Sequence, residues 1–229
     1  MYAKKNSTVK VVVTLLAVAL LIIGAIGGTL AWLMDSTDSV KNTFTAGKVN
    51  ISLKETPYSD GSYGTDKVEG QDNEYPAIPG ATYKKDPTVA VEEGSEDCYL
   101  FVEFKYTPEA ENCLNYKSNL TAENGWKQIV TSEPGTEVWY RVVYKTDEAD
   151  ARSFDLLAAL GGSYGAGITL EIDPTYVTND TMAIAEDQEL EWNAYAVQFN
   201  YLKDATNNPI AGDSVEAATK AWTLVYPGE

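Results

Sequence analysis

An uncharged apolar run near the N-terminus constrains this chain more than any other feature. Residues 11–26 carry no charge, and Lys4, Lys5 and Lys10 supply every charge of the first 31 residues. The run is slightly longer than the apolar part of a secretory signal, and slightly shorter than the roughly 20 residues that span a bilayer as a helix. It predicts an N-terminal hydrophobic signal helix that directs the rest of the chain across a membrane.

The end of this apolar run has two interpretations. The small residues Thr29 and Ala31 stand at positions −3 and −1 of a cut between Ala31 and Trp32, which predicts a cleaved signal peptide over residues 1–31. The alternative is an uncleaved membrane anchor, because apolar residues as far as Leu33 extend the run to spanning length. In both cases we expect the exported part to contact the membrane only through this leader.

Charge and histidine content limit the function classes. The whole chain carries a net charge of −17, and the leader holds three lysines and no acid, so the exported part carries −20. Such a charge disfavours nucleic acid and anionic membrane surfaces as partners. The chain has no histidine, which excludes HExxH zinc sites, Ser-His-Asp triads and Cys-His dyads. A pair of catalytic carboxylates is still possible. Because the chain has 34 acidic residues, however, the presence of such a pair does not indicate an active site. We expect no enzyme, no cofactor and no metal site.

Alternation of apolar and polar residues recurs along the exported part, as in half-buried strands. Pro134 and Gly135 indicate the turn of a hairpin, and Pro87 indicates an edge strand or a bulge. Residues 54–80 read as a long polar loop whose acids do not follow calcium-loop spacing. We expect about eight strands, at residues 49–53, 82–91, 98–106, 126–131, 137–145, 168–172, 192–199 and 222–226.

Helical patterns are few. Residues 149–160 could form two or three turns that end at Gly161, and residues 214–221 form a second short candidate with Asp213 as N-cap. The pattern predicts an all-β fold, a jelly-roll or Greek-key β-sandwich of about eight strands with one or two short helices. A single domain is expected over residues 32–229.

The two cysteines, Cys98 and Cys113, both lie in the exported part. They enclose one strand and the turn after it, so a disulfide between them is conceivable. In an oxidising compartment it would stabilise the fold by roughly 3 kcal/mol. A pair of free thiols is equally compatible with the sequence.

Three segments together resemble the TasA/camelysin family of exported biofilm-matrix proteins. Residues 27–53 resemble its N-terminal signature: a Gly-Gly-Thr signal end, a short aspartate-bearing segment, an Asn-Thr-Phe step, then Ala-Gly and a strand. Residues 78–104 resemble its second block, a Pro-Gly turn, a Lys-Asp strand and an acidic gap before a hydrophobic strand. Residues 192–202 resemble its C-terminal strand, with Ala-Val-Gln where the family often has Ala-Ile-Gln. The cysteine pair is a further departure.

The resemblance implies a jelly roll exported by a Gram-positive bacterium through a dedicated signal peptidase. It implies cleavage between Ala31 and Trp32, and extracellular matrix fibres built by donor-strand complementation. The partner is then another copy of the chain in a head-to-tail homopolymer, together with other matrix proteins. Residues 32–46 would be the donor segment, and its inserted side chains would be Trp32, Leu33, Met34, Val40 and Phe44. Some relatives carry a metalloprotease label, which the absence of histidine argues against here.

Two alternatives stay open at this point. Residues 32–46 can fold back within the same chain as an ordinary first strand, or stay disordered. A different function class is a cell-surface adhesin or carbohydrate-binding module, monomeric or membrane-anchored, because aromatic side chains stack on sugar faces. Trp126, Trp139 and Trp192 fall in expected strands, where core packing is the commoner use. An exposed row of aromatic side chains would favour sugar binding, and an exposed apolar edge would favour polymerisation.

Overall fold

The computed structural model describes residues 34–38, 41–42, 49–129, 134–164, 167–199, 202–204 and 206–226. The apolar run of residues 11–26 and the predicted cleavage position lie outside these ranges. Within them, strands outnumber helices and all strand pairs are antiparallel, which confirms the all-β character. The described residues form sixteen strands, twice the expected number, because many are only two or three residues long.

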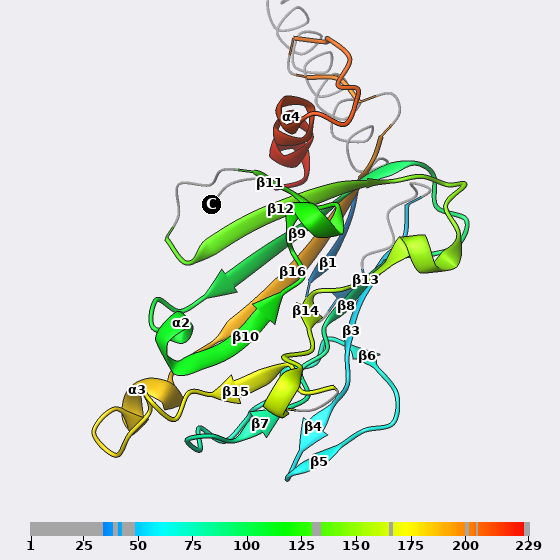
Figure 1. Ribbon diagram of the computed structural model, residues 1–229. Coiled ribbons are helices and arrows are strands. Elements are labelled where there is room, and N and C mark those ends of the chain that lie inside the picture. The colour runs from blue at the N-terminus through cyan, green and yellow to red at the C-terminus, as the bar shows by residue number, and fades with distance from the viewer. Residues whose placement is uncertain are drawn as a thin grey trace, which may run out of the picture.

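The largest sheet has six strands in the order β11-β12-β9-β16-β1-β2 (Figure 1). Their bounds are β11 Lys127–Ile129, β12 Thr136–Val143, β9 Cys98–Tyr106, β16 Leu190–Gln198, β1 Met34–Asp38 and β2 Lys41–Asn42. The first seven residues of β9 are buried. Leu100 and Val102 face one hydrophobic cluster, whereas Tyr99 and Phe101 face another, so this strand has a core on both of its faces.

Two four-stranded sheets and one hairpin complete the β structure of the described residues. One sheet has the order β13-β8-β3-β6, with bounds Ser153–Asp155, Thr88–Val91, Ile51–Glu55 and Val68–Glu69. The other has the order β14-β10-β15-β7, with bounds Leu157–Ala158, Leu114–Ser118, Leu170–Ile172 and Thr82–Tyr83. The hairpin joins β4, Tyr58–Ser59, to β5, Ser62–Tyr63.

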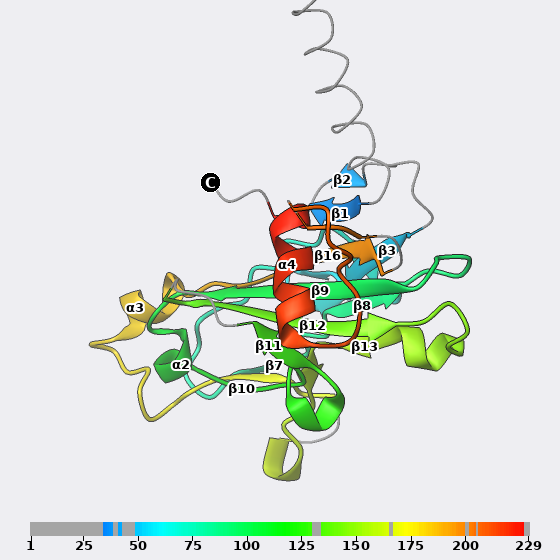
Figure 2. The same cartoon turned by 90° about the horizontal axis from the view of Figure 1, so that it is seen from above.

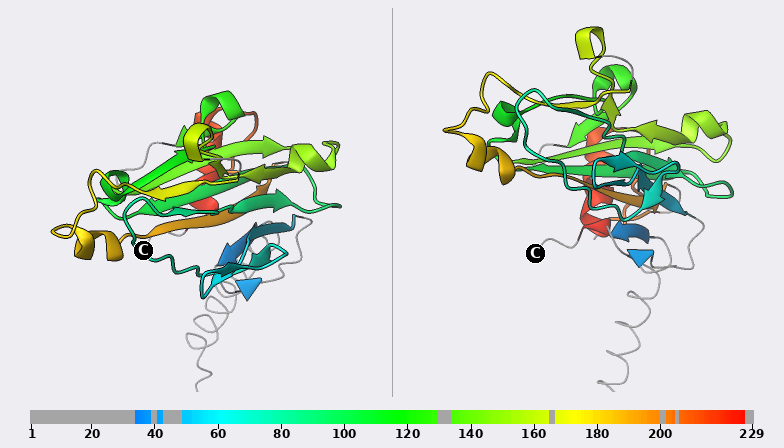
Figure 3. Two further views of the ribbon diagram at one scale, coloured as in Figure 1. Left: turned by 60° about the horizontal axis from the view of Figure 1, so that its bottom comes forward. Right: turned by 90° about the horizontal axis from the view of Figure 1, so that it is seen from below.

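Helix α4, Val215–Val225, covers one face of the six-stranded sheet (Figure 2). The views in Figure 3 look from the opposite side, with α4 in red behind the strands. The other helical segments of the described ranges are α2 Ala110–Cys113, α3 Met182–Glu186, η1 Ala122–Asn124, η2 Ala149–Arg152 and η3 Gly162–Tyr164.

The C-terminal prediction was partly wrong. A helix was expected at residues 214–221, but α4 also includes residues 222–225, which were expected to form a closing strand. Ser214, not Asp213, is the N-cap, and its hydroxyl accepts a hydrogen bond from the Ala217 N–H at 3.1 Å. Trp222 and Val225 lie on the helix face that packs on the sheet, so the burial of their side chains favours a helix over a strand here.

The prediction of a helix at residues 149–160 was also wrong. Only residues 149–152 are helical, as η2, and the chain then forms the short strands β13 and β14. Phe154 pairs with Val89 of β8 and packs against the core. The Arg152 guanidinium donates hydrogen bonds to the backbone carbonyls of Val91 and Glu92, at 3.2 and 2.5 Å. These contacts with a distant part of the sequence override the local helical preference.

The predictions drawn from Pro87 and Pro134 have different outcomes. Pro87 was expected at an edge strand or bulge, but it precedes β8, which lies between β13 and β3. There it separates β7 of one sheet from β8 of another. The predicted hairpin is confirmed, because β11 pairs with β12. Gly135 has φ +75°, and a Cβ here would lie 2.5 Å from the Tyr106 carbonyl oxygen, so only glycine fits this approach.

Candidate functional site

Strand β16 presents two different edges to its neighbours. On one side it pairs with β9 over nine positions, from Leu190 to Gln198. On the other side it pairs with β1 over only four. Its pairing with β9 therefore does not depend on β1. The sequence predicts the alternation of β16, but nothing in it marks this strand as the neighbour of the N-terminal segment.

The register between β1 and β16 is antiparallel. The partners are Met34 with Val197, Asp35 with Ala196, Ser36 with Tyr195 and Thr37 with Ala194. Strand β1 also contacts β3 and α4, so these elements and β16 define its position, which we call the β1 slot. The segment expected to act as a donor thus pairs within its own chain in this structure, as the folding-back alternative describes.

The predicted assembly residues are only partly described. Met34 begins β1 and lies opposite Val197. The other predicted positions, both at the cleavage point and in the donor segment, lie outside the described residues: Ala31, Trp32, Leu33, Val40 and Phe44. The structure therefore brings one predicted assembly residue to β16.

A polar cluster joins β16 to β9 on the face that α4 covers. Glu103 of β9 is 1% exposed. Its carboxylate accepts hydrogen bonds from Asn193 Nδ2 at 3.3 Å and from the Tyr195 hydroxyl at 3.5 Å. Lys105 Nζ lies 3.5 Å from the same carboxylate. Burial alone would lower the pKa of Lys105, but the attraction of Glu103 raises it above its ordinary value. The cluster thus keeps the wall of the slot in place.

The rings of Trp222 in α4 and of Tyr226, the residue after the helix, lie against the same strand. The Tyr195 ring centroid is 5.2 Å from that of Trp222 and 6.1 Å from that of Tyr226, and both pairs are edge-to-face. Trp222 and Tyr226 stack on each other at 4.7 Å. These contacts hold α4 against β16 at the position opposite Ser36.

Among the described residues, the aromatic side chains do not form the exposed row that sugar binding would favour. Trp126 and Trp192 are buried, and the half-buried Trp139 donates from Nε1 to Glu137 at 2.8 Å. The exposed large hydrophobic side chains among the described residues are Tyr63, Val68, Ile78, Tyr144, Ile184 and Val215. No tryptophan is among them.

The two cysteines are free thiols. Cys98 begins β9, whose nine residues extend roughly 26 Å, and Cys113 ends α2 beyond the far end of that strand. They belong to different hydrophobic clusters, so the bridge considered from the sequence does not form within the chain. Burial raises the pKa of the Cys98 thiol to about 12, which keeps it protonated and unreactive.

The described residues contain no group of three or more side chains suited to holding a metal ion, and no helix with the length and apolar character needed to cross a membrane. Comparison of the chain with models of known protein families, with curated proteins and with solved structures gives no match.

Proposed function

We propose that this protein is an exported structural subunit that assembles head to tail into extracellular fibres. In the fibre, the N-terminal strand of one copy occupies the β1 slot of the next. The jelly-roll connectivity and the cleavage between Ala31 and Trp32, both implied by the family resemblance, belong to this proposal. The assembled form needs no catalytic group, cofactor or metal.

The four-residue pairing of β1 with β16 carries the proposal. When β1 leaves, the nine pairs between β16 and β9 remain, so the slot keeps its shape. Its backbone N–H and C=O groups then lack partners, and an identical strand from another copy satisfies them in the same register. An exchange of this kind preserves every hydrogen bond between the two strands.

The position of β1 in the chain favours this exchange. It begins eight residues after the apolar run of residues 11–26, so an attached leader restricts where it can reach. After cleavage the strand is linked to the rest of the chain through residues 39–50, which lead to β3. Pairing of β1 within its own chain and pairing between two chains use the same contacts. The balance between them therefore depends on the protein concentration relative to the effective concentration of the tethered strand. A head-to-tail contact does not close on itself, so it produces a filament.

Deletion of residues 32–40 tests the proposal. We expect a folded monomer that forms no filaments by electron microscopy, while the unaltered exported chain starts at Trp32 and forms them. A synthetic peptide of residues 32–46 should bind the deleted protein, whereas a peptide with the same residues in scrambled order should not. Filaments that persist after the deletion would overturn the proposal.

A further inference from the structure

Strand β1 is paired on both of its sides. One side pairs with β16 over four positions, and the other pairs with β2, where Thr37 lies opposite Asn42 and Asp38 lies opposite Lys41. Strand β2 is the last strand of the six-stranded sheet, and among the described strands it pairs with β1 alone (Figure 2). The N-terminal segment therefore forms a short hairpin in its own chain, and not a single extended strand.

The hairpin shortens the link between β1 and the rest of the chain. Because β2 is antiparallel to β1, the chain leaves β2 in the direction opposite to that of β1. Strand β3 begins at Ile51, which is nine Cα steps after Asn42, so this link extends to at most about 32 Å. Strand β1 also contacts β3 in the structure. The closed hairpin thus suits a β1 slot that lies beside the β3 of the same chain.

Head-to-tail assembly requires a longer link. A compact domain of the size of residues 32–229 has a radius of gyration of about 16 Å, and therefore a diameter of roughly 40 Å. In a filament, each point on one copy lies at least one axial repeat from the same point on the next copy. Because the slot lies beside β3, a β1 strand in the slot of the next copy is about 40 Å from its own β3. The link that follows a closed hairpin is too short for this distance.

Unpairing of β2 from β1 supplies the missing length. The link then starts at Asp38, thirteen Cα steps before Ile51, and extends to about 47 Å. Only the two residue pairs between β1 and β2 are lost, whereas the four pairs between β1 and β16 form again in the next copy. Opening of the hairpin therefore changes the reach of β1 and leaves its fit to the slot unchanged.

We infer that β2 regulates the β1 slot as a latch. While β2 is paired with β1, the strand stays in the slot of its own chain and the protein is a monomer. When β2 unpairs, β1 can reach the slot of another copy. This inference rests on the proposed function, because it concerns the control of the same exchange. It adds that opening of the β1–β2 hairpin precedes assembly.

A disulfide across the hairpin tests this inference in the chain that starts at Trp32. Thr37→Cys and Asn42→Cys lie opposite each other, at a separation that suits a disulfide. We expect the oxidised variant to form at least tenfold fewer filaments than the unaltered chain by electron microscopy, and reduction to restore them. Normal filaments from the oxidised variant would overturn the latch and leave the proposed function standing. Absence of filaments from the unaltered chain would overturn both.

Two further measurements separate lost reach from lost fit. Insertion of six Gly and Ser residues after Gly47 lengthens the link by about 20 Å, so the oxidised variant with this insertion should form filaments again. The oxidised variant without the insertion should unfold in urea at a midpoint no lower than that of the unaltered chain. Failure of the insertion to restore filaments would overturn the inference. A clearly lower midpoint would also overturn it, because the disulfide would then have disturbed the fit of β1.

Discussion

The buried ion pair between Lys85 and Glu55 makes a strong prediction about stability. The two residues are 7% and 8% exposed, and Lys85 Nζ contacts both oxygens of Glu55 at 3.2 Å. The perturbation is Lys85→Met, which keeps the apolar stem and removes the charge. The backbone N–H of Lys85 still donates to Thr169 Oγ1 at 2.7 Å, so the main chain stays fixed. The variant thus isolates the effect of leaving Glu55 without its partner.

Breaking a buried ion pair costs about 3–5 kcal/mol, whereas replacing both partners is often close to neutral. This pair borders a cleft that water can enter, so we expect the lower end, about 3 kcal/mol, for Lys85→Met. The double variant Lys85→Met with Glu55→Gln leaves neither charge of the pair, and Gln can still accept a hydrogen bond from the Tyr75 hydroxyl. We expect it to cost about 1 kcal/mol. The two substitutions are therefore strongly non-additive.

Urea unfolding followed by circular dichroism measures these free energies, provided the slope with denaturant is unchanged. Lys84→Met is the matched control, because its side chain is 46% exposed and its partner Asp86 also pairs with Lys67. We expect that control to cost less than about 1 kcal/mol. A cost for Lys85→Met no larger than for Lys84→Met would refute the reasoning, as would a double variant that is less stable than Lys85→Met alone.

Three further perturbations have defined outcomes. Burial alone would raise the pKa of Asp86, but hydrogen bonds from the Thr56 N–H and hydroxyl hold it below the ordinary value. The ionised form is therefore favoured by folding, and Asp86→Asn should cost about 1–2 kcal/mol at neutral pH. This difference should vanish in urea titrations at a pH below the folded pKa, and its persistence there would contradict the assignment. Trp222→Ala should cost about 3 kcal/mol by urea unfolding, because Trp222 is 8% exposed and packs on β16 and β9; a loss below 1 kcal/mol would contradict this packing. Neither Cys98 nor Cys113 should react with iodoacetamide in the folded chain, and both should react in urea; a mass two hydrogens lower before reduction would instead indicate a bridge.

The long strands could be predicted because their patterns are strong and local. Residues 98–106 were expected as a strand and form β9 with those bounds, since aromatic and β-branched side chains suit a strand buried on both faces. The C-terminal residues could not be assigned locally. Trp222 and Val225 suit a strand by composition, but Ala217, Ala218 and Ala221 allow a helix to approach the sheet closely, and only the packed structure reveals that fit.

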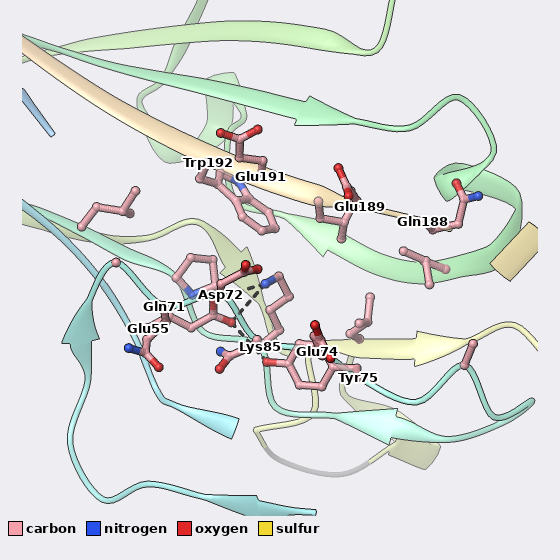
Figure 4. Close-up of a pocket in the computed structure, with 18 of the residues that line it drawn as sticks. Glu55, Gln71, Asp72, Glu74, Tyr75, Lys85, Gln188, Glu189, Glu191 and Trp192 are labelled. Carbon is pink, nitrogen blue, oxygen red and sulfur yellow. Dashed lines mark hydrogen bonds and ion pairs between the residues drawn. The ribbon is translucent and has the colours of Figure 1, made fainter. Parts of the chain in front are cut away.

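The sites were less predictable than the strands. The N-terminal segment was identified as an extended strand, but the four-residue stretch of β16 that pairs with it has no local mark in the sequence. A cleft of about 910 Å³ beside Trp192 (Figure 4) was missed because one of its walls lies in residues 54–80, which read as a solvated loop. Asn73 accepts from the Tyr58 N–H at 2.8 Å and donates to the Thr56 carbonyl at 3.0 Å, which fixes that loop to β3 and β4. Such contacts between distant residues carry no periodic pattern.

A cysteine pair placed across the β1 slot tests the central claim most directly. Met34→Cys and Val197→Cys lie opposite each other, at a Cα separation that antiparallel pairing makes suitable for a disulfide. Oxidation of assembled filaments, followed by denaturing electrophoresis without reductant, should give a ladder of covalently joined subunits that collapses on reduction. The Val197→Cys variant alone should give none. If filaments of the double variant contain only disulfides within single chains, each strand has stayed in its own slot and the account of assembly is wrong.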